Sequence, residues 1–182
     1  MSTLKIHTIE SAPAESKPLL EKAVKGFGMI PGLHGVLANA PKTYEAYQKL
    51  HELFQGSSFN NEELTVVWQT INVEHECHYC VPAHTGIAHM MKVDASITEA
   101  LRNRQTLADE KLQTLHETTL SIVRNRGRIS DAELEKFYSA GYGEQQVLEI
   151  LLGLAQKTIS NYTNHIANTP VDEPFKKFEW SK

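Results

Sequence analysis

The residues best suited to chemistry in this chain are its cysteines. Only two are present, Cys77 and Cys80, and His84 lies four positions after the second. If this stretch is helical, the three side chains lie at i, i+3 and i+7 and share one face. An imidazole beside a thiol favours the thiolate, which is the form that attacks peroxides and disulfides. The pattern therefore predicts a redox-active site.

Length and charge limit the kinds of protein that can carry this motif. The chain has 182 residues and a net charge of -4, and its lysines and arginines form no block, which argues against a nucleic-acid surface. No stretch approaches the roughly 18 consecutive apolar residues of a membrane span, and the first residues lack the apolar core of a signal peptide. We therefore expect a cytoplasmic protein that binds neither nucleic acid nor membrane. In a reducing compartment, a close pair of cysteines is more often catalytic, redox-active or metal-binding than structural.

A metal site is the main rival interpretation of the motif. Two cysteines and one histidine supply three ligands, whereas zinc requires four, and His75, His78 or His165 could provide the fourth. Three ligands on one helix face encircle an ion poorly, however, and structural zinc sites generally collect their ligands from two separate segments. The sequence therefore favours redox chemistry, with no metal.

The rest of the chain indicates helices throughout. Apolar residues recur at helical spacing, and almost no segment alternates as a strand does. A capping box at Asn60 and Glu63 predicts one helix start, and a second box at Ser130 and Glu133 predicts another. The next helix after residue 63 should hold both cysteines and end near Met91. We expect one all-α domain of about seven or eight helices over residues 1–182, with its core at about 31–170 and a frayed tail after that.

The residues around the cysteines also resemble a known family. The segment 63–88, and with it the stretches 127–133, 141–143 and 160–165, is similar to the alkyl hydroperoxidase D-like branch of the carboxymuconolactone decarboxylase family. The resemblance covers most of the chain, and the cysteine run is its most specific part. It implies an all-helical homo-oligomer that reduces hydroperoxides through a disulfide cycle. That cycle needs a separate thiol reductant and no cofactor beyond the redox-active disulfide.

The resemblance also assigns roles to individual residues. It implies that Cys80 is the peroxidatic thiol, Cys77 the resolving thiol and His84 the group that accepts the Cys80 proton. Helical geometry agrees, since Cys77 would lie one turn before Cys80 and His84 one turn after it. Residues at i and i+3 of a helix have Cα atoms roughly 5 Å apart, which a disulfide can bridge.

One position departs from the family pattern. Many members carry a glutamate twelve residues before the first cysteine, as part of a proton relay, and here that residue is Thr65, which cannot take a proton at neutral pH. Glu74 is our expected replacement, although it could equally be a carboxylate at a helix end. Glu63 is a weaker candidate because capping explains it. Tyr79 and His165 are further possible relay residues, and packing or a structural hydrogen bond would explain each as well.

Two other functions remain open at this point. The chain could be a non-redox enzyme on the same fold, similar to a lactone decarboxylase, with His84 as the base. It could also be a metal-binding or redox-sensing protein without turnover. The substrate hydroperoxide and the reductant are not specified by the sequence, because pocket shape and docking surface come from residues scattered along the chain.

Overall fold

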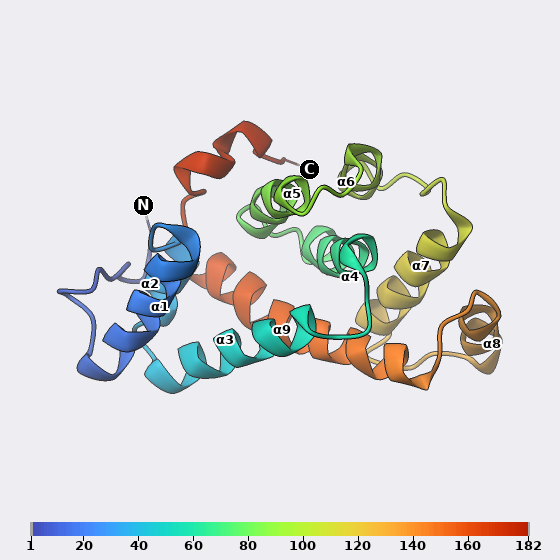
Figure 1. The fold of residues 1–182 in the computed structure, drawn as a ribbon, viewed down its shortest axis with the longest axis horizontal. Helices are drawn as coiled ribbons and strands as arrows, with labels where there is room; N and C mark the ends of the chain where they lie inside the picture. Colours follow the sequence, from blue (N-terminus) through green and yellow to red (C-terminus); the bar gives the residue numbers. More distant parts are fainter. Residues whose placement is uncertain (1, 182) are drawn as a thin grey trace.

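The structure, a computed structural model that describes residues 2–181, is entirely helical over that range (Figure 1). The all-α prediction is therefore confirmed, and eight of the α-helices are longer than six residues. The elements in chain order are η1 (Ala14–Ser16), α1 (Lys17–Phe27), α2 (Gly32–Leu37), α3 (Pro41–Gln55), α4 (Asn61–Glu74), α5 (Cys80–Met90), α6 (Ala95–Arg102), α7 (Glu110–Arg124), α8 (Asp131–Ser139), α9 (Glu144–Ala167) and η2 (Glu173–Phe178).

Helix α4 is the centre of the fold. It packs against α5, α6, α7 and α9, while α3 lies along α9 at the lower edge of the view (Figure 1). All but the terminal positions of α4 are buried, so the helix has no solvent-facing stripe. A helix that is apolar or buried all round belongs in a core, and α4 therefore serves as the support against which the neighbouring helices are placed.

Both predicted capping boxes are present. The Asn60 side chain accepts hydrogen bonds from the first turn of α4, and the Glu63 carboxylate accepts one from the Asn60 backbone. Ser130 and Glu133 make the same reciprocal pair at the start of α8. These bonds satisfy N–H groups that the helix itself cannot, which is why the two helix starts were visible in the sequence.

Helix α9 buries a polar face, contrary to what its apolar residues predict. Leu151 and Tyr162 recur at helical spacing with the other apolar residues of α9, which would place them in the core, but they are 41% and 50% exposed. The buried side of the helix carries these residues instead: Ile150, Gly153, Gln156, Lys157, Ser160, Asn161, Asn164 and Ala167. At Gly153 a Cβ atom would lie 2.9 Å from the Phe54 ring, so glycine allows α3 to approach α9 closely.

The expected frayed tail is wrong. Residues after 170 form η2, which packs against α5 and is visible above it in Figure 1. Arg102 donates hydrogen bonds to the carbonyl oxygens of Phe178 and Glu179, and Trp180 donates one to the carbonyl oxygen of Arg102. We call residues 171–181 the C-terminal strap. Within residues 2–181, no helix is both long and apolar enough to cross a membrane.

Candidate active site

The cysteine motif begins a helix rather than lying inside one. Helix α4 ends at Glu74 and α5 starts at Cys80, so Cys77 lies in the turn between them and the prediction of one helix holding both cysteines is wrong. Glu76 adopts a positive φ of 55°, which turns the chain. The Cys80 N–H then donates to Cys77 Sγ at 3.3 Å, and the Val81 N–H donates to the Cys77 carbonyl oxygen at 3.1 Å. Cys77 therefore caps α5, and Cys80 occupies the positive end of its dipole.

The two thiols are free, buried and different in acidity. Burial alone would raise the pKa of Cys80, but hydrogen bonds from Cys77 and Asn164 and the positive charge of Lys157 outweigh it and lower the pKa to about 5. The Asn164 amide donates to Cys80 Sγ at 3.3 Å. Burial, together with the neighbouring Cys80 sulfur, raises the pKa of Cys77. Cys80 is therefore the more acidic thiol of the pair, and its surroundings favour the thiolate.

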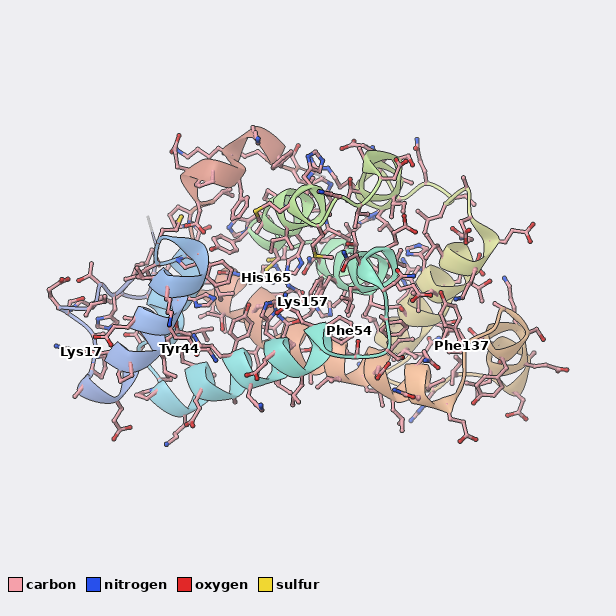
Figure 2. All side chains as sticks on the ribbon, in the orientation of Figure 1. Lys17, Tyr44, Phe54, Phe137, Lys157 and His165 are labelled. Atoms are coloured by element: carbon pink, nitrogen blue, oxygen red, sulfur yellow. The ribbon has the colours of Figure 1, made fainter. Side chains whose placement is uncertain are left out.

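Lys157 and His84 form the other half of the site. Lys157 is 1% exposed and is labelled near the middle of the molecule in Figure 2, and its Nζ donates to His84 Nε2 at 2.9 Å. Burial, and then the charge of Lys157, lowers the pKa of His84 well below its usual value, so the imidazole is neutral. Burial lowers the pKa of Lys157, while the charge on the cysteine sulfurs acts to raise it. When Lys157 is protonated its ammonium can only donate, so Nε2 is then the acceptor and the ring proton lies on Nδ1. That Nδ1 is buried and has no hydrogen-bond partner among residues 2–181.

A chain of side-chain amides fixes the backbone of Cys80. Asn72 donates to the Cys80 carbonyl oxygen at 3.4 Å and to Gln69 at 3.0 Å, and it accepts from Asn161 at 3.0 Å. Asn161 in turn accepts a hydrogen bond from His75 at 2.9 Å. Each donor in this buried chain has an acceptor, so the chain holds the thiolate and α9 in one relative position.

A small apolar pocket of about 80 Å³ gives access to Cys80. Burial lowers the pKa of His34 to about 3 and that of His51 to about 4, so both of these pocket histidines are neutral. Among residues 2–181, no Asp or Glu lines the pocket. The lining residues are Phe27, Pro31, Leu33, His34, Tyr47, His51, Tyr79, Cys80, Ala83, His84, Ile87, Met90, Lys157 and Phe175.

The two glutamates expected as relay candidates contact other residues. Arg124 donates two hydrogen bonds to the Glu74 carboxylate at 2.8 and 2.9 Å, and these bonds hold the pKa of Glu74 below its usual value. Glu63 closes its capping box and pairs with Lys111 at 3.0 Å. Thr65, at the position of the family glutamate, donates to the Asn61 carbonyl oxygen. A carboxylate with a lowered pKa carries a proton poorly at neutral pH, so the structure offers no support for Glu74 in a relay.

The two remaining relay candidates are Tyr79, in the turn before α5, and His165, near the end of α9. Tyr79 lines the pocket, but its hydroxyl donates to Asp172 of the strap at 2.5 Å and accepts from the Leu33 N–H at 3.3 Å. His165 is exposed and stacks against Tyr162. Neither makes a hydrogen bond to a cysteine within the described residues, and a relay role for either stays a prediction. No group of three or more His, Cys, Asp or Glu side chains in residues 2–181 is placed to hold a metal ion.

Sequence reasoning missed Lys157 and Asn161. A signal for them was present, because Lys157, Asn161 and Asn164 lie at i, i+4 and i+7 and so share one helix face. A helix face that carries a lysine and two asparagines usually contacts solvent, so the sequence alone suggests an exposed face. In the structure this face is buried because it packs against the cysteine turn, whose groups bind its polar side chains.

Comparison with solved structures identifies the fold. An uncharacterized peroxidase-related protein from Ralstonia eutropha JMP134, described as an alkylhydroperoxidase AhpD core, matches with a TM-score of 0.82 and 16% identity over 96% of this chain and 94% of its own. A peroxidase-related protein from Silicibacter sp. TM1040 matches with a TM-score of 0.80 and 18% identity over 95% and 92%. The debrominase Bmp8, as a cysteine-to-alanine variant in complex with 2,3,4-tribromopyrrole, matches with a TM-score of 0.76 and 14% identity over 97% and 95%.

Comparison at the level of sequence adds nothing to this result. No family model matches the chain, and no curated protein does. At these identities the likeness concerns the fold alone, and the cysteine motif had pointed to the same group of proteins. The chain therefore has the alkylhydroperoxidase D-like fold that its residues predicted.

Proposed function

We propose that this protein is a cysteine-based peroxidase in which the Cys80 thiolate attacks the hydroperoxide. The observation that carries the proposal is the environment of Cys80. Cys80 lines the pocket, its sulfur accepts a hydrogen bond from Asn164, and the charge of the buried Lys157 lowers its pKa. A stabilised thiolate with access to a small apolar pocket is the arrangement that reaction with an organic hydroperoxide requires.

The reaction proceeds in two steps within the cysteine turn. The Cys80 thiolate takes the terminal oxygen of ROOH to give a sulfenic acid, and RO⁻ leaves and is protonated to the alcohol. The Cys77 thiol then attacks the sulfenic sulfur, which forms the disulfide and releases water. The hydrogen bond between the Cys80 N–H and Cys77 Sγ supports this step, because it keeps Cys77 directed at the start of α5.

An external dithiol returns the disulfide to two thiols. Cys77 and Cys80 are both fully or almost fully buried. A reductant can therefore reach the sulfurs only when a segment that covers them moves away. The C-terminal strap is our candidate for that segment, because its Phe175 lines the pocket. Thiol–disulfide exchange requires the attacking thiolate to reach a sulfur directly, so access rather than chemistry is expected to limit this half of the cycle.

Thiol counting with the Cys80→Ser and Cys77→Ser variants tests the proposal. The wild-type protein should lose both thiols on addition of one equivalent of cumene hydroperoxide and regain them with dithiothreitol. Cys80→Ser should consume no peroxide, and Cys77→Ser should form one sulfenic acid per chain without steady turnover, as read by dimedone labelling and mass spectrometry. An unchanged peroxide rate in folded Cys80→Ser would refute the assignment.

A second candidate is reductive removal of a halogen from an aromatic ring. The debrominase with the same fold was crystallised with a brominated pyrrole, and the pocket of this chain is apolar and partly aromatic. Replacement of bromine by hydrogen consumes two electrons, which the Cys77 and Cys80 thiols can supply by forming a disulfide. Bromide release from 2,3,4-tribromopyrrole in the presence of dithiothreitol distinguishes this activity from peroxide reduction.

A further inference from the structure

We propose that Lys157 is the proton store of the cysteine site and that it delivers its proton to the leaving alkoxide through the ring of His84. This inference rests on the proposed function and deepens it. Many members of the family that the chain resembles have a glutamate in the proton relay, and this chain has Thr65 at that position, which cannot carry a proton. The inference assigns proton transfer to Lys157 of α9 instead. The three groups concerned are Cys80, His84 and Lys157, which come from two helices that meet only in the folded chain.

The hydrogen bond to His84 gives Lys157 a direct route for its proton. Its Nζ lies 2.9 Å from His84 Nε2, and the lysine side chain is buried. On the other side of the ring, His84 Nδ1 is buried and without a partner in residues 2–181, and His84 lines the pocket in which the peroxide must bind. A proton can therefore pass into the ring at Nε2 while another leaves from Nδ1 toward the substrate.

The charges around Lys157 explain why it holds a proton at all. A buried ammonium is costly unless an opposite charge lies close to it. The groups in residues 2–181 that act to raise the pKa of Lys157 are the sulfurs of Cys80 and then Cys77, and we take the Cys80 thiolate as its counter-charge. The titratable groups that face Lys157 from the packed elements are Cys77 and Cys80 of the turn and α5, His84 of α5, His51 of α3 and His75 at the end of α4.

Reaction with the peroxide removes that counter-charge. When Cys80 becomes a sulfenic acid, the site contains an ammonium without a thiolate and, next to it, an alkoxide without a proton. Transfer through His84 removes both charges together. The step balances as Cys80–S⁻ + ROOH + Lys157–NH₃⁺ → Cys80–SOH + ROH + Lys157–NH₂, with His84 neutral before and after and its ring proton moved from Nδ1 to Nε2.

The external dithiol then restores the starting state. Reduction of the disulfide gives two thiols, and the Cys80 thiol transfers its proton to the neutral Lys157 amine through the same ring, which returns the thiolate and the ammonium. His84 transmits the proton without storing it, because its burial beside Lys157 keeps its pKa far below neutrality. This differs from a role for His84 as the base that holds the Cys80 proton.

Two substitutions separate the charge of Lys157 from its proton. Lys157→Met removes both, whereas Lys157→Arg keeps a cation whose pKa above about 12 prevents it from giving up a proton. Lys49→Met is the matched control, because Lys49 is a surface residue paired with Glu52. Circular dichroism and thermal unfolding establish that each variant is folded.

Two readouts are needed for these variants. Alkylation of Cys80 by iodoacetamide releases iodide and requires no proton donor, so a change of its pH midpoint in these variants reports the loss of the Lys157 charge and not the loss of its proton. Stopped-flow reaction with cumene hydroperoxide requires the proton as well. For Lys157→Met we expect the alkylation midpoint to move to higher pH, with the rate at pH 6 reduced about tenfold for each pH unit by which the midpoint rises above 6. For Lys157→Arg we expect a midpoint close to wild type but peroxide reaction at least tenfold slower.

The outcomes distinguish this inference from the proposed function. If the wild-type protein consumes no hydroperoxide, the proposed function fails and the proton transfer fails with it. If the wild type is active and Lys157→Met leaves both the midpoint and the peroxide rate unchanged, Lys157 has no such role. Wild-type peroxide kinetics in Lys157→Arg would overturn proton delivery while leaving the charge pairing intact. Lys49→Met should match wild type in both measurements.

Discussion

Replacing Gly86 by alanine should loosen the C-terminal strap and expose the thiolate. Gly86 lies inside α5 opposite η2, and a Cβ atom there would lie 2.5 and 2.6 Å from two carbons of the Phe175 ring and 3.3 Å from Phe178. Ordinary contacts between carbon atoms are about 3.5–4.0 Å. The ring therefore has to move by about 1 Å, and since Phe175 lines the pocket, the movement changes access to Cys80.

The magnitude follows from two opposing terms. Overpacking of this kind costs about 1–3 kcal/mol, and glycine to alanine in a helix interior gains about 0.8–1 kcal/mol. Gly26→Ala is the matched control because Gly26 also lies inside a helix and its Cβ would meet nothing within 4 Å. The difference between the two variants isolates the overpacking cost. At about 2–4 °C per kcal/mol for a chain of this size, Gly86→Ala should melt about 2–12 °C below Gly26→Ala.

Alkylation measures the functional consequence. At pH 7 the Cys80 thiol is ionised, so the iodoacetamide rate reports access rather than acidity. Each kcal/mol lost from the closed strap raises the open population about fivefold, and the alkylation rate should rise by the same factor in Gly86→Ala but not in Gly26→Ala. Equal melting temperatures in the two variants would show that the strap is not packed against α5. A lower melting temperature with an unchanged alkylation rate would show that the strap does not control access.

Three further substitutions test the electrostatics of the site. Asn164→Leu removes a donor to the thiolate worth about 1.5–3 kcal/mol, so the pH below which Cys80 loses its charge should rise by about one to two pH units in an alkylation profile. Cys80→Ser leaves Lys157 without its counter-charge, so it should cost up to about 3–5 kcal/mol in urea unfolding at a pH low enough to keep the lysine protonated, and the double variant with Lys157→Met should recover most of that cost. Glu74→Gln breaks a partly exposed ion pair with Arg124, so it should lower the free energy of unfolding by no more than about 1 kcal/mol. It should also leave the alkylation profile of Cys80 unchanged, and a shifted profile would show that Glu74 influences the acidity of the thiol.

Local interactions were predictable from the sequence, and the helix starts show why. The capping boxes at Asn60 and Ser130 depend on side chains three residues apart, so the sequence contains the whole interaction. The prediction that Cys77 lies inside the helix was wrong, because the position of the helix start depends on backbone conformation as well as on residue spacing. Glu76 takes a left-handed conformation, and the Cys77 sulfur then replaces the helix bond that the Cys80 N–H would otherwise make. Periodicity cannot distinguish a cysteine that caps a helix from one that lies within it.

The strap and the buried lysine were missed because their partners are distant in sequence. Asp172 joins the strap to Tyr79 and to the Gly32 N–H, residues that are 93 and 140 positions away. A polar tail of this composition appears frayed until those partners are known. Lys157 lies 73 positions from His84, and a lysine is almost never buried unless it is paired. Chemistry-bearing residues of this kind are recognised only when the opposing helix is in place.

Burial of the polar face of α9 depends on burial of the cysteine turn, and the reverse also holds, because each supplies the polar partners of the other. Lys157, Asn161 and Asn164 would each lose hydration in the core without the thiolate and the amide chain opposite them. The Cys80 thiolate, equally, would lose its charge to burial without those residues, because burial is the largest influence on its pKa and acts to raise it. The same contacts that hold α9 against α4 and α5 thus keep the nucleophile ionised, and a substitution that weakens one is expected to weaken the other. This coupling places the sulfur that we propose as the nucleophile in the interior, where bulk water is excluded and the proposed delivery of a proton by Lys157 through His84 would take its place.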